Sequence, residues 1–250
     1  MFRFFRTIRR DLIVRNRFTN YLLYALGEIV LVVIGILIAL QINNWNDLRK
    51  AHELEMKYLG NIKADLVNNI AEIDRFIEDR SGCIEDASIV IGHLEGVPIA
   101  DLSDFNRRCI RNYEWRRFAQ INFTFEELIS SGNLALISST RIKSSLLRLE
   151  SAYTANKAEE DHYRFDSEEL LYKPLYHQVD LHPMLRDFTG ETGVLSWDHF
   201  EVFMTDPRFK NGFLMVILEL SKLNEQLEEM KGICMDLITE IDAELDLTTQ

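Results

Sequence analysis

The most prominent hydrophobic pattern in the chain is an apolar stretch near its N-terminus, YLLYALGEIVLVVIGILIALQI, residues 21–42. A helix of about 20 apolar residues is long enough to cross the hydrocarbon core of a bilayer. A central charge costs about 2.5–3.5 kcal/mol on the insertion scale, and each Leu, Ile, Val or Phe returns about 0.3–0.6 kcal/mol. The apolar residues therefore offset Glu28, and we expect residues 21–42 to form a transmembrane helix.

Beyond this stretch, apolar residues recur every three or four positions, which is the period of a helix packed on one face. One such series runs from Leu59 to Ile77, and another forms a coiled-coil-like seam from Phe213 to Ile241. The chain has only 11 Gly and 4 Pro, fewer than a turn-rich β-sandwich uses. These patterns predict a mostly α protein, in which one transmembrane helix continues into an antiparallel bundle of long helices, with residues 80–135 and 175–206 packed at the ends of the bundle.

Capping signals predict the boundaries of the shorter helices. Residues 124–127, TFEE, match a capping box, and Gly132-Asn133 is expected to end the helix that this box begins. The alternative to a simple turn is that the exposed backbone amides of this SSGNL segment, residues 130–134, bind a ligand. Ser103 is expected to cap a further short helix.

The second half of the chain carries further boundary signals. We expect Ser138 or Ser139 to cap a helix that ends at Pro174. Residues 183–206 show no clear period and leave room for a short strand or hairpin. Asp206-Pro207 then has the pattern of a helix start, with Asp as the cap and Pro in the first turn.

The charge of the chain is unevenly distributed. Residues 1–20 carry six Arg and one Asp, whereas residues 43–250 carry 22 basic and 38 acidic side chains, a net charge of −16. Basic segments stay on the cytoplasmic side of a membrane. We therefore expect a basic cytoplasmic tip (1–20), an uncleaved signal-anchor helix (21–42) and an acidic helical domain in the periplasm (43–250), all attached to the inner membrane. A cleaved signal peptide is disfavoured because the apolar stretch is too long and no A-x-A site follows it.

The basic tip has helical spacing of its own. Four arginines fall on one face of a helix, which is typical of a helix lying on an anionic membrane surface: Arg3, Arg6, Arg10 and Arg17. The alternative is a basic flank that only sets the orientation. The acidic domain repels phosphate backbones, so we expect no nucleic-acid partner.

Within the apolar stretch, Glu28, Gly35 and Ala39 recur at intervals of seven and four residues and share one side of a helix. Small residues four apart allow close approach of a second helix, and an intramembrane carboxylate favours a partner that donates to it. These three residues are candidates for self-association or for contact with another membrane protein. The alternative is chance, since apolar helices often contain Gly and Ala.

The sequence resembles a family of uncharacterised bacterial single-span membrane proteins. The resemblance rests on YLLYALGEIVLVVIGILIALQINNWN and on FTFEELISSGNLALISSTRIKSSLLRLESAY, and it covers residues 1–60 and 120–155. It implies a short basic cytoplasmic end, one membrane span and a mostly helical extracytoplasmic domain. The family has no assigned activity, so the resemblance implies no functional residues.

Three cysteines allow one disulfide in an oxidising compartment, and Cys83 with Cys109 is the candidate pair. Cys234 lies on the apolar seam and is expected to be a buried apolar side chain. If unpaired, Cys109 is the one whose neighbouring arginines would favour a thiolate.

His177, Asp180 and His182 lie close together in sequence and are candidate metal ligands, although solvated side chains are the alternative. Glu159 and His162 form one Glu-x-x-His, but a di-iron bundle requires a second copy, which the sequence lacks. No nucleophile-elbow, phosphate-loop, dinucleotide-binding or zinc-protease motif occurs either. We therefore expect no cofactor and no enzymatic activity.

The function predicted from these features is a membrane-anchored periplasmic domain that acts through protein contacts. One alternative is an extracytoplasmic ligand-binding or sensory module that signals through a partner and has an apolar pocket near residues 177–197. A second alternative is an enzyme whose site lacks a known motif. No small-molecule ligand is indicated.

Overall fold

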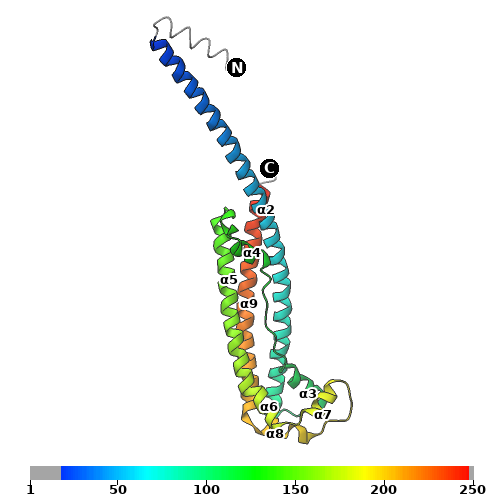
Figure 1. Ribbon diagram of the computed structural model, residues 1–250. Coiled ribbons are helices and arrows are strands. Elements are labelled where there is room, and N and C mark those ends of the chain that lie inside the picture. Colours follow the sequence, from blue (N-terminus) through cyan, green and yellow to red (C-terminus); the bar gives the residue numbers. More distant parts are fainter. Residues whose placement is uncertain (1–17, 248–250) are drawn as a thin grey trace. The chain divides into compact units, whose positions relative to one another are not determined.

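The apolar stretch lies in the longest helix of the protein. In the computed structural model, which describes residues 18–247, α2 runs from Phe18 to Leu94 (Figure 1). The chain divides into two compact units, Met1–Met56 and Lys57–Gln250, and α2 contributes to both. The protein is mostly α, as the apolar periodicity predicts, and residues 18–247 contain no β-strand.

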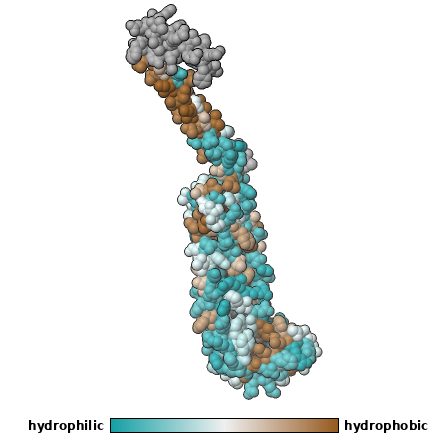
Figure 2. Space-filling view, viewed as in Figure 1, coloured by the Kyte–Doolittle hydropathy of each residue, from teal (hydrophilic) through white to brown (hydrophobic). Residues whose placement is uncertain are grey.

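The first unit exposes its apolar side chains. From Leu26 to Ile42 every large apolar side chain is exposed, and Leu31 reaches 73%. Figure 2 shows this helix as a largely hydrophobic surface. It contains the one stretch in residues 18–247 that is long and apolar enough to cross a membrane, and none of that stretch is buried. The predicted span is therefore a candidate membrane anchor.

The second unit is built on three long helices: its part of α2, α5 and α9 (Figure 1). Shorter helices connect them. The elements after α2 are α3 (Leu102–Arg111), α4 (Phe123–Ser130), η1 (Asn133–Leu136), α5 (Thr140–Ser167), η2 (Glu168–Tyr172), α6 (Lys173–Gln178), α7 (Leu181–Phe188), η3 (Trp197–Phe200), α8 (Glu201–Thr205) and α9 (Pro207–Leu247).

The helix α9 is antiparallel to both of its long neighbours. Along α2, residue numbers rise as those of the facing residues on α9 fall, and three ion pairs of 2.5 Å show this register: Lys63–Asp242, Lys231–Asp74 and Lys210–Glu95. The pairs Arg148–Glu229 and Lys222–Glu159 show the same relation between α5 and α9. The antiparallel bundle that the apolar series predict is confirmed for these helices.

The predicted apolar seam forms the centre of this bundle. Nine residues of α9 in steps of three and four are at most 4% exposed: Phe213, Val216, Leu220, Leu223, Leu227, Met230, Cys234, Leu237 and Ile241. Leu59, Ile62, Leu66 and Ile73 of α2 are equally buried. Burial of one face on each helix therefore supplies the main stabilisation of the second unit.

The capping box predicted at residues 124–127 is wrong. Asn122 precedes α4 without a side-chain cap, and the backbone N–H of Thr124 donates instead to Asp65 of α2, at 3.1 Å. Glu127 accepts a hydrogen bond from the Tyr58 hydroxyl at 3.0 Å. Tertiary partners on α2 thus replace the local box. The end of α4 is predicted correctly, because Gly132 has a φ of +73°.

The start of α5 is also predicted correctly, since the Ser139 hydroxyl accepts from the backbone N–H of Ile142 at 3.3 Å. Its end is not at Pro174. A π-helical turn, η2, follows α5 directly, and the chain stays helical through α6, with Pro174 in the first turn of that helix. Pro174 has no backbone N–H to donate, and it directly follows the π-helical turn, where the regular i→i−4 hydrogen-bond pattern is already interrupted.

The strand or hairpin expected in residues 183–206 is also wrong. The helices α7, η3 and α8 occupy most of this range, and with α3 and α6 they gather at one end of the second unit (Figure 1). The cap of α3 is Asp101, which accepts from the backbone N–H of Ser103 at 2.8 Å, so Ser103 is not the cap. Asp206 does precede α9, as predicted.

A segment without regular structure, residues 114–122, runs along the bundle (Figure 1). Phe118 is buried in it, and both backbone groups of Ile121 bond to the Asn69 side chain at 2.7 Å. The place of this segment along the bundle differs from the prediction, which puts residues 80–135 at the bundle ends. The buried Phe118 and the paired backbone of Ile121 explain why this segment lies along the helices instead.

Candidate functional site

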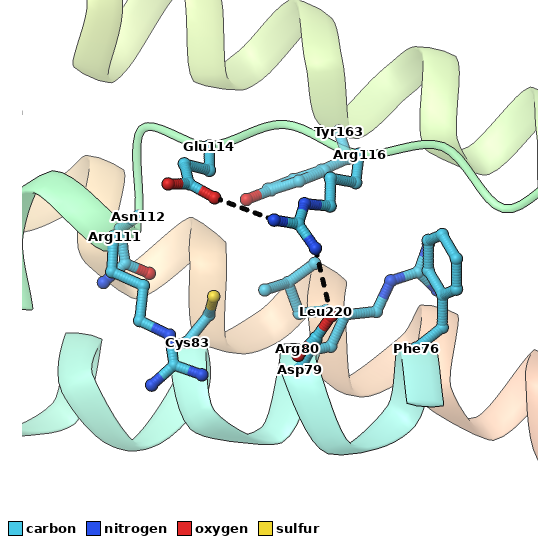
Figure 3. A pocket seen from close by; sticks show the side chains of 10 residues that line it. All are labelled: Phe76, Asp79, Arg80, Cys83, Arg111, Asn112, Glu114, Arg116, Tyr163 and Leu220. Carbon is cyan, nitrogen blue, oxygen red and sulfur yellow. Dashed lines mark hydrogen bonds and ion pairs between the residues drawn. The ribbon is translucent and has the colours of Figure 1, made fainter. Parts of the chain in front are cut away.

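The second unit contains a cavity of about 100 Å³ between its long helices and the segment that follows α3 (Figure 3). Apolar atoms form much of its wall, but six of the ten lining residues have charged or amide side chains, and three of these are arginines. The lining residues are Phe76, Asp79, Arg80, Cys83, Arg111, Asn112, Glu114, Arg116, Tyr163 and Leu220. A volume of this size holds a few water molecules or a small ion, and it is well below the roughly 300–1,000 Å³ of a drug-sized ligand site.

Arg116 lies across the cavity mouth. Its guanidinium donates to Glu114 at 3.2 Å and to Asp79 of α2 at 3.3 Å, and Figure 3 shows both interactions. Arg111 donates to Asp86 at 3.2 Å. The three carboxylates and the two guanidiniums all form ion pairs. These ion pairs fix the side chains on the exposed side of the cavity.

Arg80 forms the inner wall of the cavity and is 6% exposed. Its Nη2 lies 2.5 Å from Oε1 of Glu160 on α5, and the same oxygen accepts from the backbone N–H of Phe118 at 2.9 Å. Burial lowers the pKa of Arg80 and raises the pKa of Glu160, each opposed by the partner's charge. We assign both groups as charged, because a guanidinium keeps its proton in proteins, Oε1 of the carboxylate accepts two hydrogen bonds, and Arg117 lies 3.6 Å from its Oε2.

One donor of this buried pair is unused. The Nη1 atom of Arg80 is buried and has no hydrogen-bond partner among residues 18–247. An unsatisfied buried donor costs about 1–3 kcal/mol or more when it is charged. The Arg80 side chain lines the cavity, and a small rotation of the guanidinium would expose this atom to a water molecule or an anion held there.

The cysteines are unpaired. Cys83 is half-buried in the cavity wall, Cys109 is completely buried in α3, and the disulfide considered between them is not formed. Burial raises the pKa of both thiols, that of Cys109 strongly, so the expected stabilisation of the Cys109 thiolate is wrong. The neighbouring arginines point at Asp86 and leave Cys109 in an apolar environment. Cys234 is buried in the seam, as expected.

The candidate metal ligands His177, Asp180 and His182 are exposed and do not converge. Asp180 caps α7 and accepts from the backbone N–H of His182 at 3.0 Å, which gives it a local structural role. The short α6 and the turn after it separate these side chains.

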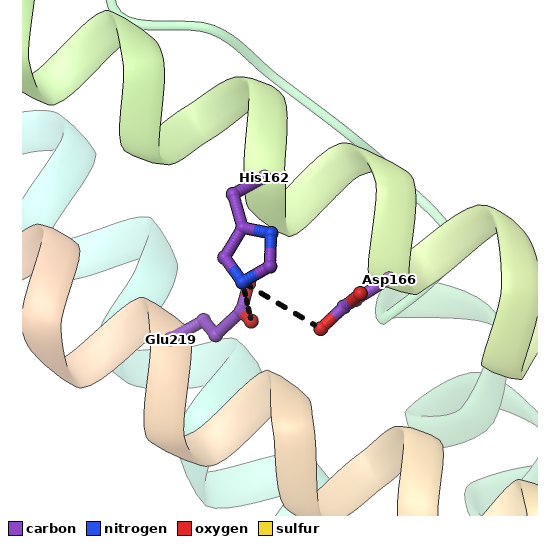
Figure 4. A group of neighbouring side chains, drawn as sticks. All are labelled: His162, Asp166 and Glu219. Carbon is purple, nitrogen blue, oxygen red and sulfur yellow. Dashed lines mark ion pairs between the residues drawn. The ribbon is translucent and has the colours of Figure 1, made fainter.

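A different histidine does meet carboxylates. His162 and Asp166 of α5 face Glu219 of α9, and one ligand atom from each lies within 4.8 Å of the others (Figure 4). His162 Nε2 lies 3.7 Å from Glu219 Oε1 and 4.0 Å from Asp166 Oδ2. Burial and the adjacent Asp166 raise the pKa of Glu219 to about 7. Sequence reasoning noted His162 but missed Glu219, which only the antiparallel register brings to it.

The candidate association face is open. Glu28 and Ala39 are exposed, and a methyl group added at Gly35 would meet no other atom within 4 Å. This geometry leaves the backbone accessible to a second helix. The arginines of the basic tip, Arg3, Arg6, Arg10 and Arg17, lie outside the described residues.

Comparison with known proteins links the chain to one family. A family model described as a family of unknown function (DUF6090) matches residues 28–172, which is more than half of the 250 residues. The match includes α3, α4, α5 and nine of the ten cavity residues, whereas Glu219 lies beyond it. No curated protein and no solved structure matches the chain. The chain therefore belongs to the family of unknown function DUF6090.

Proposed function

We propose that this protein is anchored in the cytoplasmic membrane by the first half of α2 and acts, without catalysing a reaction, through protein contacts in the periplasm. The exposed apolar surface from Leu26 to Ile42 carries the proposal. Contiguous apolar patches of more than a few hundred Å² rarely stay exposed on soluble proteins. In a bilayer, lipid chains would surround this helix and cover its apolar side chains on all sides.

The charge distribution supports the orientation. Six arginines precede the apolar stretch, and the residues after it have a net charge of −16. Positive charge retained on the cytoplasmic side would direct the second unit outward. The acidic second unit then faces away from the anionic cytoplasmic leaflet, which agrees with the same orientation.

The interior of the second unit supports contact rather than catalysis. The cavity beside Arg80 is about 100 Å³, and a second, more open pocket of about 320 Å³ is lined mainly by polar side chains of α3 and α7, not by the apolar side chains that a ligand-binding module would have near residues 177–197. The open Gly35 face of the first unit supports association in the membrane, with a second copy or with another single-span protein.

Cell fractionation with protease treatment tests the anchor and the orientation. A full-length chain with a C-terminal epitope should resist extraction with alkaline carbonate and lose the epitope when protease is added to intact spheroplasts. A cytoplasmic marker protein should stay uncut in the same sample. Recovery of the chain without membranes, or an epitope that is cut only after lysis, would overturn the proposal.

Crosslinking in intact cells tests the protein contacts. After detergent extraction, the chain should appear in crosslinked species that mass spectrometry resolves into one recurring partner or a homodimer. A chain recovered only as an uncrosslinked monomer at native expression would refute the contact role, while the fractionation result would still stand by itself.

A second candidate function is the recognition of a small anion by the arginine-lined cavity. The unpartnered Nη1 of Arg80 favours it, since this buried donor lacks an acceptor and two further arginines line the same space. A carboxylate or phosphate group would supply the missing acceptor. The membrane-anchored domain would then be a sensory module that passes the signal to a partner.

A thermal-shift series tests this second candidate. Phosphate and acetate should each raise the melting temperature of the full chain in detergent at constant ionic strength, and Arg111→Gln should reduce the shift. Arg148→Gln is the matched control, because Arg148 is 64% exposed on α5 and does not line the cavity. An equal shift in both variants would indicate a general salt effect and exclude the cavity.

A further inference from the structure

Three potential metal ligands converge on the surface between α5 and α9. His162 and Asp166 are four residues apart on α5, which places them on one face a single turn apart. Glu219 approaches from α9, and Figure 4 shows all three side chains directed at the same point. Two packed helices of 28 and 41 residues hold them, so the positions are set by regular backbone and not by a loop.

One oxygen of the buried carboxylate in this cluster has no hydrogen-bond partner. Glu219 is 4% exposed, and its Oε2 atom is buried without a hydrogen-bond partner among residues 18–247. A buried ionised carboxylate is costly unless it is paired or coordinates a metal. The unsatisfied oxygen therefore indicates a group that the chain itself does not supply.

The charge around the cluster is not compensated by a permanent cation. In the described part of the chain, the ion pairs of Asp166 and of Glu219 are to His162 alone. Lys222, three residues after Glu219 on α9, is paired with Glu159 at 2.5 Å. Metal ligands must be deprotonated, and with a neutral imidazole and both carboxyl groups ionised the site carries two negative charges, which a divalent cation would neutralise.

We propose that His162, Asp166 and Glu219 bind a divalent first-row transition metal ion through Nε2 and two carboxylate oxygens. An imidazole together with carboxylates is a donor set that Zn²⁺ and its neighbours accept, whereas Mg²⁺ and Ca²⁺ prefer oxygen ligands only. Tetrahedral Zn²⁺ with bonds of about 2.0–2.2 Å requires ligand atoms roughly 3.3 Å apart. The observed distances of 3.7 and 4.0 Å reach this value through small rotations of the side chains.

One side of the site stays open to solvent. His162 is 58% exposed and Asp166 is 21% exposed, whereas Glu219 forms the buried floor. Three protein ligands leave a fourth position for water in tetrahedral Zn²⁺ sites. A bound metal would join α5 to α9 by direct coordination, and this role is independent of the proposed protein contacts.

Titration of the purified full chain with ZnCl₂ tests the proposal. The protein is prepared in detergent without a histidine tag, freed of metal with a chelator and then dialysed. Calorimetry should show one Zn²⁺ bound per chain with a micromolar dissociation constant. Addition of Co²⁺ should produce the visible absorption of a low-symmetry complex, which reports coordination directly.

Variants locate the binding. Each of His162→Gln, Asp166→Asn and Glu219→Gln should weaken Zn²⁺ binding by at least about tenfold, since loss of a supporting partner alone costs about that much. His177→Gln and Glu225→Gln, which change an exposed histidine and an exposed glutamate outside the cluster, should bind as the unmodified chain does. His162→Gln changes an exposed side chain and therefore keeps the fold even if Glu219→Gln does not.

Two results would overturn the proposal. One is the absence of saturable Zn²⁺ binding at millimolar concentration by the unmodified chain. The other is unchanged affinity and unchanged Co²⁺ absorption in His162→Gln, which would place the metal at another histidine.

Discussion

Arg80 on α2 and Glu160 on α5 form an ion pair of 2.5 Å whose side chains are only 7% and 1% exposed. The pair joins two of the three long helices, and the amide of Phe118 ties the irregular segment to the same carboxylate oxygen. Charges at this depth depend on each other, because water is not available to replace a lost partner.

Breaking this pair should strongly destabilise the second unit. Glu160→Leu leaves Arg80 buried without a counter-charge, and we expect a loss of about 3–5 kcal/mol in the free energy of unfolding. The double variant Arg80→Met, Glu160→Leu should recover part of this loss. Circular dichroism during urea unfolding of the full chain in detergent measures both effects.

The matched control is an exposed pair between helices. Arg148 and Glu229 lie 3.3 Å apart with side chains 64% and 63% exposed. Glu229→Leu should change stability by less than about 1 kcal/mol, as is usual for surface ion pairs. If Glu160→Leu and Glu229→Leu lowered the free energy of unfolding equally, burial would not explain the cost of breaking an ion pair.

The second prediction concerns two glycines of α9. A methyl group at Gly212 would lie 2.7 Å from Cγ of Leu171 and closer still to its Cδ2, whereas one at Gly232 would meet no atom within 4 Å. Gly212→Ala should therefore cost about 1–3 kcal/mol through overpacking. Gly232→Ala should stabilise the helix by about 0.5–1 kcal/mol. Opposite signs in thermal unfolding of the two variants confirm the close approach, and a gain at Gly212 would refute it.

The third prediction concerns the thiols. Burial raises the pKa of all three cysteines, that of Cys234 to about 12, but only Cys83 is partly exposed. In the native chain, iodoacetamide should modify Cys83 first, and the rate should still increase with pH above 9. All three should react in denaturant. Mass spectrometry of digests measures this order, and equally fast modification of Cys109 would contradict its burial.

The fourth prediction concerns the membrane helix. Gly35→Ile adds a branched side chain to the stripe that includes Glu28 and should reduce crosslinked dimer or heterodimer in membranes several-fold. Gly27→Ile is the matched control, because at about 100° per residue it lies on an adjacent face. Equal loss of crosslinking in both variants would assign the effect to the bulk of the side chain and not to the stripe.

The fifth prediction is a pH effect at the start of α9. Hydrogen bonds from Arg208 lower the pKa of Asp206 to about 2. A lowered pKa in the folded state contributes stability that is complete above the unfolded pKa of about 3.9 and is lost as the pH falls towards 2. Asp206→Asn should thus lower the melting temperature at pH 6 but make no difference near pH 2. A difference that persists near pH 2 would contradict this assignment.

Much of the fold follows from apolar spacing. The spacing of the apolar residues from Phe213 to Ile241 predicts that they are buried. A helix with apolar residues every three or four positions has one apolar face, and that face packs against other helices. The Gly132 and Ser139 boundaries follow from local backbone chemistry. The TFEE box fails for the opposite reason, since Asp65 and Tyr58 come from a distant part of the chain and replace local bonds.

The candidate sites were harder to predict. His177, Asp180 and His182 are close in sequence, yet Asp180 caps α7 and the three side chains do not converge. Glu219 reaches His162 only because α9 returns antiparallel along α5, and the pairing of one glutamate among many cannot be read from periodicity. Arg80 carries no signal of burial either, because a charged residue in a helical pattern is usually expected on the exposed face.

The π-helical turn η2 has a consequence for the architecture around it. Such a turn behaves as an α-helix with one surplus residue, and its backbone N–H of Lys173 bonds to the carbonyl of Glu168. Deleting a single residue between 168 and 172 would restore regular winding, but it would rotate everything downstream by about 100°. Leu175 would then leave the interior, and α6, α7 and α8 would no longer pack on this end of the bundle. The extra residue therefore sets the rotation of the helix that follows it, and with it the direction in which this end of the second unit faces.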